Sequence, residues 1–100
     1  MITAHVAEKA ILQFERPIAA QHAGGNMVQN EAATCWHLSR GRFRCIMLFW
    51  FVQRPYDLHP PVVGLDATLT PTHHRAPVRH QNYAGYLKAR GTVYKVRRTR

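Results

Sequence analysis

The amino-terminal segment has the spacing of an amphipathic helix. Within residues 1–16, the apolar positions at spacings of three, four and seven are Ala4, Ala10, Ile11 and Phe14. This pattern predicts a docking helix with one apolar face, and it leaves Glu8 and Glu15 on other faces. Pro17 removes a backbone donor and is expected to end or bend the helix.

Residues 18–34 are mostly small or polar and show no apolar period. The Gly24-Gly25 pair breaks regular structure. No Lys-Ser/Thr follows the pair at the spacing of a phosphate-binding loop. We therefore expect a flexible or extended linker.

The strongest hydrophobic signal lies between residues 45 and 52, where the sequence reads CIMLFWFV without a polar interruption. Gln53 and Arg54 close the run, and Pro55 stops any helix near that point. This run is too short to cross a bilayer, because a spanning helix needs about 20 residues. It fits equally well as a fully buried strand.

Residues upstream of the run allow a longer helix that spans a membrane. Trp36 and Tyr56 flank the run, where aromatic belts lie. A helix over residues 36–54 is about 28 Å long, close to the thickness of the hydrocarbon core. The side chains that can reach from its first half to the interface are Arg40, Arg42 and Arg44. Hydropathy alone leaves both interpretations open, the buried strand and the membrane span.

The carboxyl-terminal half is proline-rich at first and then basic. Prolines punctuate residues 55–78 and exclude a long helix, so an extended or polyproline-like path is expected. Residues 79–100 hold no acid. They allow a short helix near 82–90 that ends at Gly91. A brief strand is also expected, at Thr92, Val93, Tyr94 and Val96.

Charge narrows the class of partner. Fourteen lysines and arginines stand against five acids, which gives a net charge of +9. Such a chain binds an anionic partner: nucleic acid, lipid headgroups or an acidic protein surface. At 100 residues it forms at most one small domain, which is marginally stable without a disulfide, a metal or a partner.

Few residues suggest catalysis or metal binding. Ser39 lacks the G-x-S-x-G turn of a hydrolase nucleophile. Cys35 and Cys45 permit one disulfide but imply no framework, and two unrelated thiols are the simpler interpretation. His73, His74 and His80 form a cluster. It lacks the nearby carboxylate that is usual at a catalytic zinc site. We expect no catalytic residue, no metal and no cofactor.

The middle of the chain resembles a known family. In order, its residues are Trp36-His37, Gly41, Cys45-Ile46-Met47, Phe49-Trp50-Phe51, Arg54, Asp57 and Pro61-Val62-Val63-Gly64, preceded by Ala23-Gly24-Gly25. This order resembles the AGGG-type small accessory subunit of mitochondrial respiratory complex I. It departs from that family at Leu48, where an aromatic is usual, in its closely placed arginines, and in the basic tail.

The resemblance implies a mostly α fold with long irregular segments. An amphipathic helix and linker would occupy residues 1–35, a single transmembrane helix 36–55, and an extended Pro-rich and basic tail 56–100. The packing side chains would be Trp36, Cys45, Met47, Phe49, Trp50 and Phe51. The headgroup contacts would come from Arg40, Arg42, Arg44 and Arg54.

The same resemblance implies a role and a place. The chain would be a non-catalytic subunit that supports the distal membrane arm of complex I in the mitochondrial inner membrane. Its partners would be other membrane-arm subunits of this hetero-oligomeric complex and phospholipid such as cardiolipin. Nucleic acid has no part in this interpretation.

An organellar ribosomal protein is the alternative. Tyr83, Tyr86 and Tyr94 interleave with basic residues of the tail, and aromatic and guanidinium groups bind bases and phosphates. Under this hypothesis the apolar run is a buried strand, and residues 90–100 face phosphate. No RRM or KH motif is present in the sequence.

Overall fold

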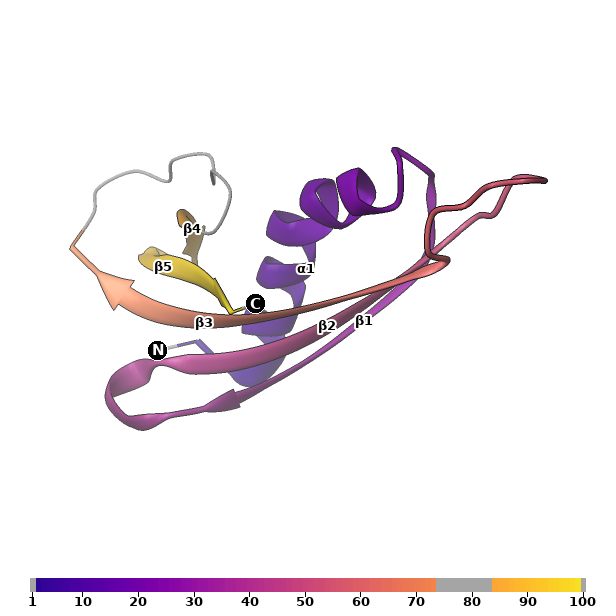
Figure 1. Cartoon of the computed structure of the whole chain (residues 1–100). Coiled ribbons are helices and arrows are strands. Elements are labelled where there is room, and N and C mark those ends of the chain that lie inside the picture. Colours follow the sequence, from indigo (N-terminus) through magenta and orange to yellow (C-terminus); the bar gives the residue numbers. More distant parts are fainter. Residues whose placement is uncertain (1, 74–83, 100) are drawn as a thin grey trace.

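One amino-terminal helix packs on a five-stranded antiparallel sheet, which makes this an α+β fold (Figure 1). The computed structural model describes residues 2–73 and 84–99. Its elements are α1 (Ala4–His22), β1 (Val28–His37), a 3-10 turn (Ser39–Gly41), β2 (Phe43–Phe51), β3 (Val62–Thr72), β4 (Ala84–Ala89) and β5 (Thr92–Thr99). The strand order is β1-β2-β3-β5-β4, so β5 lies between β3 and β4.

The expected amphipathic helix is confirmed, but it continues past Pro17. Thr3 caps α1 by accepting a hydrogen bond from the Val6 N–H (3.2 Å). The helix closes at two glycines in the left-handed region, where the N–H of Gly25 donates to the Ala20 carbonyl (2.7 Å). The prediction that residues 18–34 form a linker is wrong. Their first part is the last turn of α1, held by core packing of Ala19 and Ala23.

The apolar run forms β2 and not a membrane helix. Alternate side chains of this strand point toward α1 and are buried; they are Phe43, Cys45, Met47, Phe49 and Phe51. They pack with Ala7 and Ile11 of the helix and with Leu69 and Val96 of β3 and β5. The strand interpretation of the run was therefore right, although one face of the strand is exposed.

The expectation of a mostly α fold with a transmembrane helix is wrong. Within the described residues, no helix is both long enough and apolar enough to span a membrane. The residues assigned to that helix, 36–55, form the end of β1, a turn, and β2. The unbroken hydrophobicity has another cause: β2 is a central strand with apolar side chains on both of its faces.

The carboxyl-terminal half is more regular than its prolines suggested. β3 pairs with β2 from Val62 onward and continues through Pro71. Pro71 lies beyond the part of β3 that pairs with β2, which ends at Leu69 opposite Phe43, so it pairs with Tyr94 of β5 alone. In place of the helix expected near 82–90, residues from Ala84 form β4. The strand expected at Thr92 is confirmed as β5.

A disulfide joins two strands of the sheet, and a buried ion pair joins the helix to the sheet. Cys35 and Cys45 lie opposite each other on β1 and β2 and form a disulfide, so the interpretation as unrelated thiols is wrong. At the other side of the core, Glu15 of α1 and Arg98 of β5 form an ion pair with a Nε–Oε2 distance of 2.6 Å. Glu15 was expected on an outer face of the helix, and it is fully buried.

Candidate functional site

The outer face of the sheet, opposite α1, carries the candidate site. Side chains alternate between the two faces of a strand. Because Cys35, Cys45 and Val96 point inward, their neighbours point outward. Directly paired residues across four strands then form a row: Trp36 on β1, Arg44 on β2, Thr68 on β3 and Arg97 on β5.

A second row lies beside the first at the same end of the sheet. Thr70 of β3 pairs with Lys95 of β5, which pairs with Tyr86 of β4. Neighbouring strands are about 4.8 Å apart, so Trp36 and Arg97 are about 14 Å apart across the sheet. We call these two rows, with Lys88 of β4, the basic half of the outer face.

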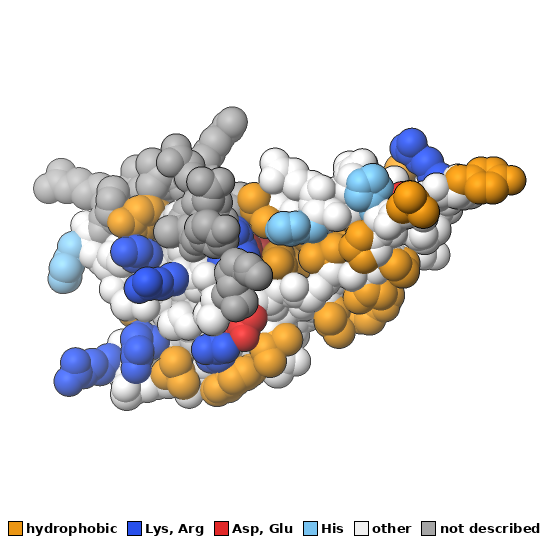
Figure 2. Space-filling model, in the orientation of Figure 1, with side chains coloured by type: hydrophobic (Ala, Val, Ile, Leu, Met, Phe, Trp, Pro, Cys, Tyr) orange, Lys and Arg blue, Asp and Glu red, His pale blue; other side chains and the backbone are white. Residues whose placement is uncertain are grey.

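The turn between β1 and β2 adds two more cations at this end. Arg40 has a left-handed backbone conformation (φ 63°) and is exposed. Arg42 is fixed by hydrogen bonds to the carbonyl and the hydroxyl of Ser39 (both 3.2 Å). These arginines line a shared hollow with Thr70 and Pro71. Figure 2 shows Lys and Arg side chains gathered at the left end of the molecule, where Figure 1 draws this turn and β5.

Every acid of the chain is engaged within the fold, and this fixes the charge of the outer face. Three acids bind arginines, in the pairs Glu15–Arg98, Glu31–Arg16 and Asp66–Arg44. Glu8 accepts from the Cys35 N–H at the free edge of β1 (2.9 Å), and Asp57 binds Asn26 and His59. In the described part of the chain, Lys88, Lys95 and Arg97 therefore form no ion pair. The basic half presents uncompensated positive charge.

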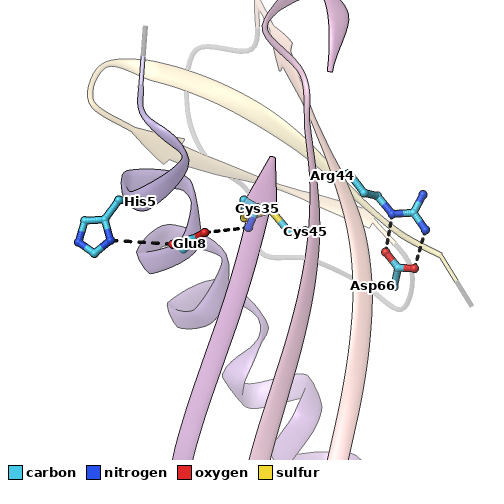
Figure 3. Close-up of a disulfide and its surroundings, with 6 residues drawn as sticks. All are labelled: His5, Glu8, Cys35, Arg44, Cys45 and Asp66. Atoms are coloured by element: carbon cyan, nitrogen blue, oxygen red, sulfur yellow. Dashed lines mark hydrogen bonds and ion pairs between the residues drawn. A yellow bond between two sulfur atoms is a disulfide. The ribbon is translucent and has the colours of Figure 1, made fainter. Parts of the chain in front are cut away.

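Arg44 and Asp66 form an ion pair on the outer face (Figure 3). Two parallel hydrogen bonds of 2.6 and 2.5 Å join the guanidinium to the carboxylate. Hydrogen bonding to Asp66 raises the pKa of Arg44 above its ordinary value. The pair neutralises Arg44, and Asp66 marks the boundary between the basic half and the rest of the face.

Beyond this pair, β2 and the start of β3 present an apolar outer face. Its exposed or half-buried side chains are Ile46, Leu48, Trp50 and Val62, on β2 and the start of β3. Among the described residues, β5 ends at Thr99, opposite Asp66, so the first residues of β3 have no paired strand on that side. A hollow of about 760 Å³ lies beside them, and its charged members Asp66 and Arg98 are held in the ion pairs described above.

The residues predicted from sequence divide between the two sides of the sheet. The inner set, in the core, is Cys45, Met47, Phe49 and Phe51, and the outer set is Trp36, Arg44 and Trp50. Arg40 and Arg42 lie in the turn beside the outer set, whereas Arg54 lies at the far end of the molecule in the loop after β2. The structure thus brings the first three arginines together with Lys95 and Arg97, which sequence reasoning had placed in a separate tail.

Among the residues that the structure describes, no three His, Cys, Asp or Glu side chains are close enough to hold a metal ion. His74 and His80 of the sequence cluster lie outside the described residues.

Searches of protein-family models, of curated proteins and of solved structures found no match to this chain.

Proposed function

We propose that this protein is a non-catalytic module that binds single-stranded nucleic acid on the basic half of its sheet. One observation carries the proposal: Trp36, Lys95 and Arg97 share an exposed face on which no acid is free to compensate the cations. A flat sheet that combines aromatic rings with basic groups is the surface on which unpaired bases stack and phosphates bind.

Each group has a distinct part in this binding. Lys95 and Arg97 are exposed on β5 with the buried Val96 between them, and they contact successive phosphates. The exposed indole of Trp36 (42% exposed) offers a ring on which a base stacks. Thr68 lies in the row between Trp36 and Arg97. Its hydroxyl supplies a neutral hydrogen-bonding group between the stacked base and the bound phosphate.

The complex I role stays a prediction. The described part of the fold does not contain the transmembrane helix that this role implied. The residues that carried the resemblance form β1, β2 and the loop after it. The alternative hypothesis asked for a buried strand at the apolar run and for basic residues near the end of the chain facing outward. β2 is a strand with one buried face, and Lys95 and Arg97 of β5 are exposed whereas the side chain of Arg98 is buried. This arrangement supports nucleic acid as the anionic partner.

Fluorescence anisotropy with a labelled single-stranded oligonucleotide tests the proposal. We expect Trp36→Ala to weaken binding by about 1–3 kcal/mol. We also expect Lys95→Ala and Arg97→Ala each to weaken binding and to lower the slope of log K against log salt by about 1. Lys9→Ala is the matched control, because Lys9 is an exposed cation on α1, on the other side of the sheet.

The proposal fails if the Lys9 variant loses as much affinity as the Lys95 and Arg97 variants. That result would mean that net charge drives binding, without a defined surface. It also fails if Trp36→Ala binds as the unchanged protein does, because stacking is the feature that separates single strands from other polyanions.

A further inference from the structure

The loop between β2 and β3, residues 52–61, projects from one end of the long molecule (Figure 1). The molecule measures 46 × 22 × 22 Å. At this end lie four of the large exposed apolar side chains, Met27, Val52, Tyr56 and Leu58. Tyr56 is 99% exposed and Leu58 is 96% exposed, so neither packs on the body of the protein. We call these four residues with Arg54 the apolar tip.

The tip is held in place by Asp57, the one acid in residues 52–61. The Asp57 carboxylate accepts hydrogen bonds from the backbone N–H (2.9 Å) and the ring Nδ1 (2.8 Å) of His59, and from the side-chain amide of Asn26. These bonds lower the pKa of Asp57 to about 2. The backbone N–H of Asp57 also donates to the Arg54 carbonyl (3.1 Å), which closes a turn around Tyr56.

Two further contacts fix the loop to the body. The N–H of Val52 donates to the carbonyl of Met27 (2.9 Å), so the base of the loop is tied to the segment before β1. The ring of His59 lies against Gly24, where an added Cβ would be 2.5 Å from its nearest atom. Tyr56 itself takes a left-handed backbone conformation (φ 65°), and its side chain is exposed.

The charge of the tip is positive and uncompensated. The side chain of Asp57 is only 9% exposed and faces its partners inside the loop. Arg54 is exposed and, within the described residues, forms no ion pair. The tip therefore combines apolar side chains, a tyrosine with a polar end, and a free cation, without an exposed carboxylate.

We propose that the apolar tip inserts into the interfacial layer of an anionic lipid bilayer. Tyrosine is suited to the boundary between headgroups and acyl chains, since its ring is apolar and its hydroxyl remains hydrated. A cation at the same depth binds anionic headgroups. The tip lies at one end of the long axis, so it reaches a membrane before the sheet does. The basic half of the sheet, at the opposite end, stays accessible.

Vesicle sedimentation with phosphatidylcholine alone, and with phosphatidylcholine mixed with cardiolipin, tests this inference. We expect binding to the anionic vesicles, and a loss of about 100-fold in the Tyr56→Ser/Leu58→Ser variant, since each buried apolar side chain contributes roughly tenfold. Arg54→Gln should weaken binding to the anionic vesicles. Ile46→Ser is the matched control, because Ile46 is an exposed apolar residue on the sheet.

Four outcomes would overturn the inference. The double variant could bind as the unchanged protein does, or Ile46→Ser could lose as much. Alternatively, Lys95→Ala/Arg97→Ala could abolish vesicle binding while the tip variant keeps it, which would assign lipid binding to the sheet. Depth is tested with Tyr56→Trp, whose added fluorescence should be quenched by brominated lipid; the absence of this quenching also contradicts insertion.

Discussion

Glu15 of α1 and Arg98 of β5 are buried together, 83 residues apart in the sequence. The guanidinium donates to both carboxylate oxygens, at 2.6 and 3.0 Å. The Glu15 side chain is fully buried and that of Arg98 is 7% exposed. We expect the pair to fix the register of the helix over the sheet, because an apolar position would tolerate sliding and a paired charge does not.

Breaking this pair on one side should cost much stability. Glu15→Ala leaves the Arg98 charge buried, and we expect a loss of about 3–5 kcal/mol in the free energy of unfolding, measured by urea denaturation. Glu15→Leu/Arg98→Met removes both charges and should cost less than the single substitution. A loss below about 1 kcal/mol for Glu15→Ala would show that the pair is not desolvated in solution.

The disulfide should stabilise the fold in proportion to the loop that it closes. Cys35 and Cys45 are separated by 10 residues, and closing such a loop is worth about 3 kcal/mol in the chain-entropy model. We expect a reducing agent to lower the free energy of unfolding by about this amount. The Cys35→Ala/Cys45→Ala variant should not respond to the reducing agent. An unchanged midpoint under reducing conditions in the unsubstituted protein would contradict the cross-link.

The loop after β2 should respond to acid through Asp57. Its pKa is about 2 in the fold, against an ordinary value of 3.8. A lowered pKa means that the loop is stabilised above about pH 4 and loses this contribution as the pH falls toward 2. The protection factor of the His59 amide against hydrogen exchange should fall over that range. Asp57→Asn should show fast exchange already at neutral pH, and equal exchange in both proteins would contradict this assignment.

Glycine at position 24 should be needed for the same loop. Its backbone has a φ of +72°, and a Cβ there would meet the ring of His59. Gly24→Ala should therefore displace His59 and speed proteolysis of residues 52–61. Gly25→Ala provides the comparison, because Gly25 has a similar φ (+79°) but nothing within 4 Å of the added atom. Equal proteolysis of both variants would mean that backbone strain alone matters.

Local patterns predicted some elements of this fold and misled on others. The helix signal near Ile11 and the strand at Thr92 follow from spacing and β-propensity, and both are confirmed. The apolar run was ambiguous because a central strand with two apolar faces has no alternation. The alternation was present just before it, where Arg42 and Arg44 flank Phe43, and this period of two was the signal for a strand.

Other features depend on contacts that no local pattern contains. The buried face of α1 consists of Ala7, Ile11, Glu15 and Ala19. The acid at position 15 breaks the apolar pattern of this face, and its burial is explained only by its pairing with Arg98. The candidate site has the same character. Trp36 and Arg97 are far apart in the sequence, and only the pairing of four strands places them on one row.

The most direct test of nucleic-acid binding is an NMR titration of the isotope-labelled protein with a short single-stranded oligonucleotide. We predict that the shifted signals include the Trp36 indole and the backbone amides of Thr68, Lys95 and Arg97, while those of α1 around Lys9 and of the tip around Tyr56 stay in place. Shifts confined to α1 or to the tip, or shifts spread evenly over all exposed cations, would contradict a nucleic-acid site on the outer face of the sheet.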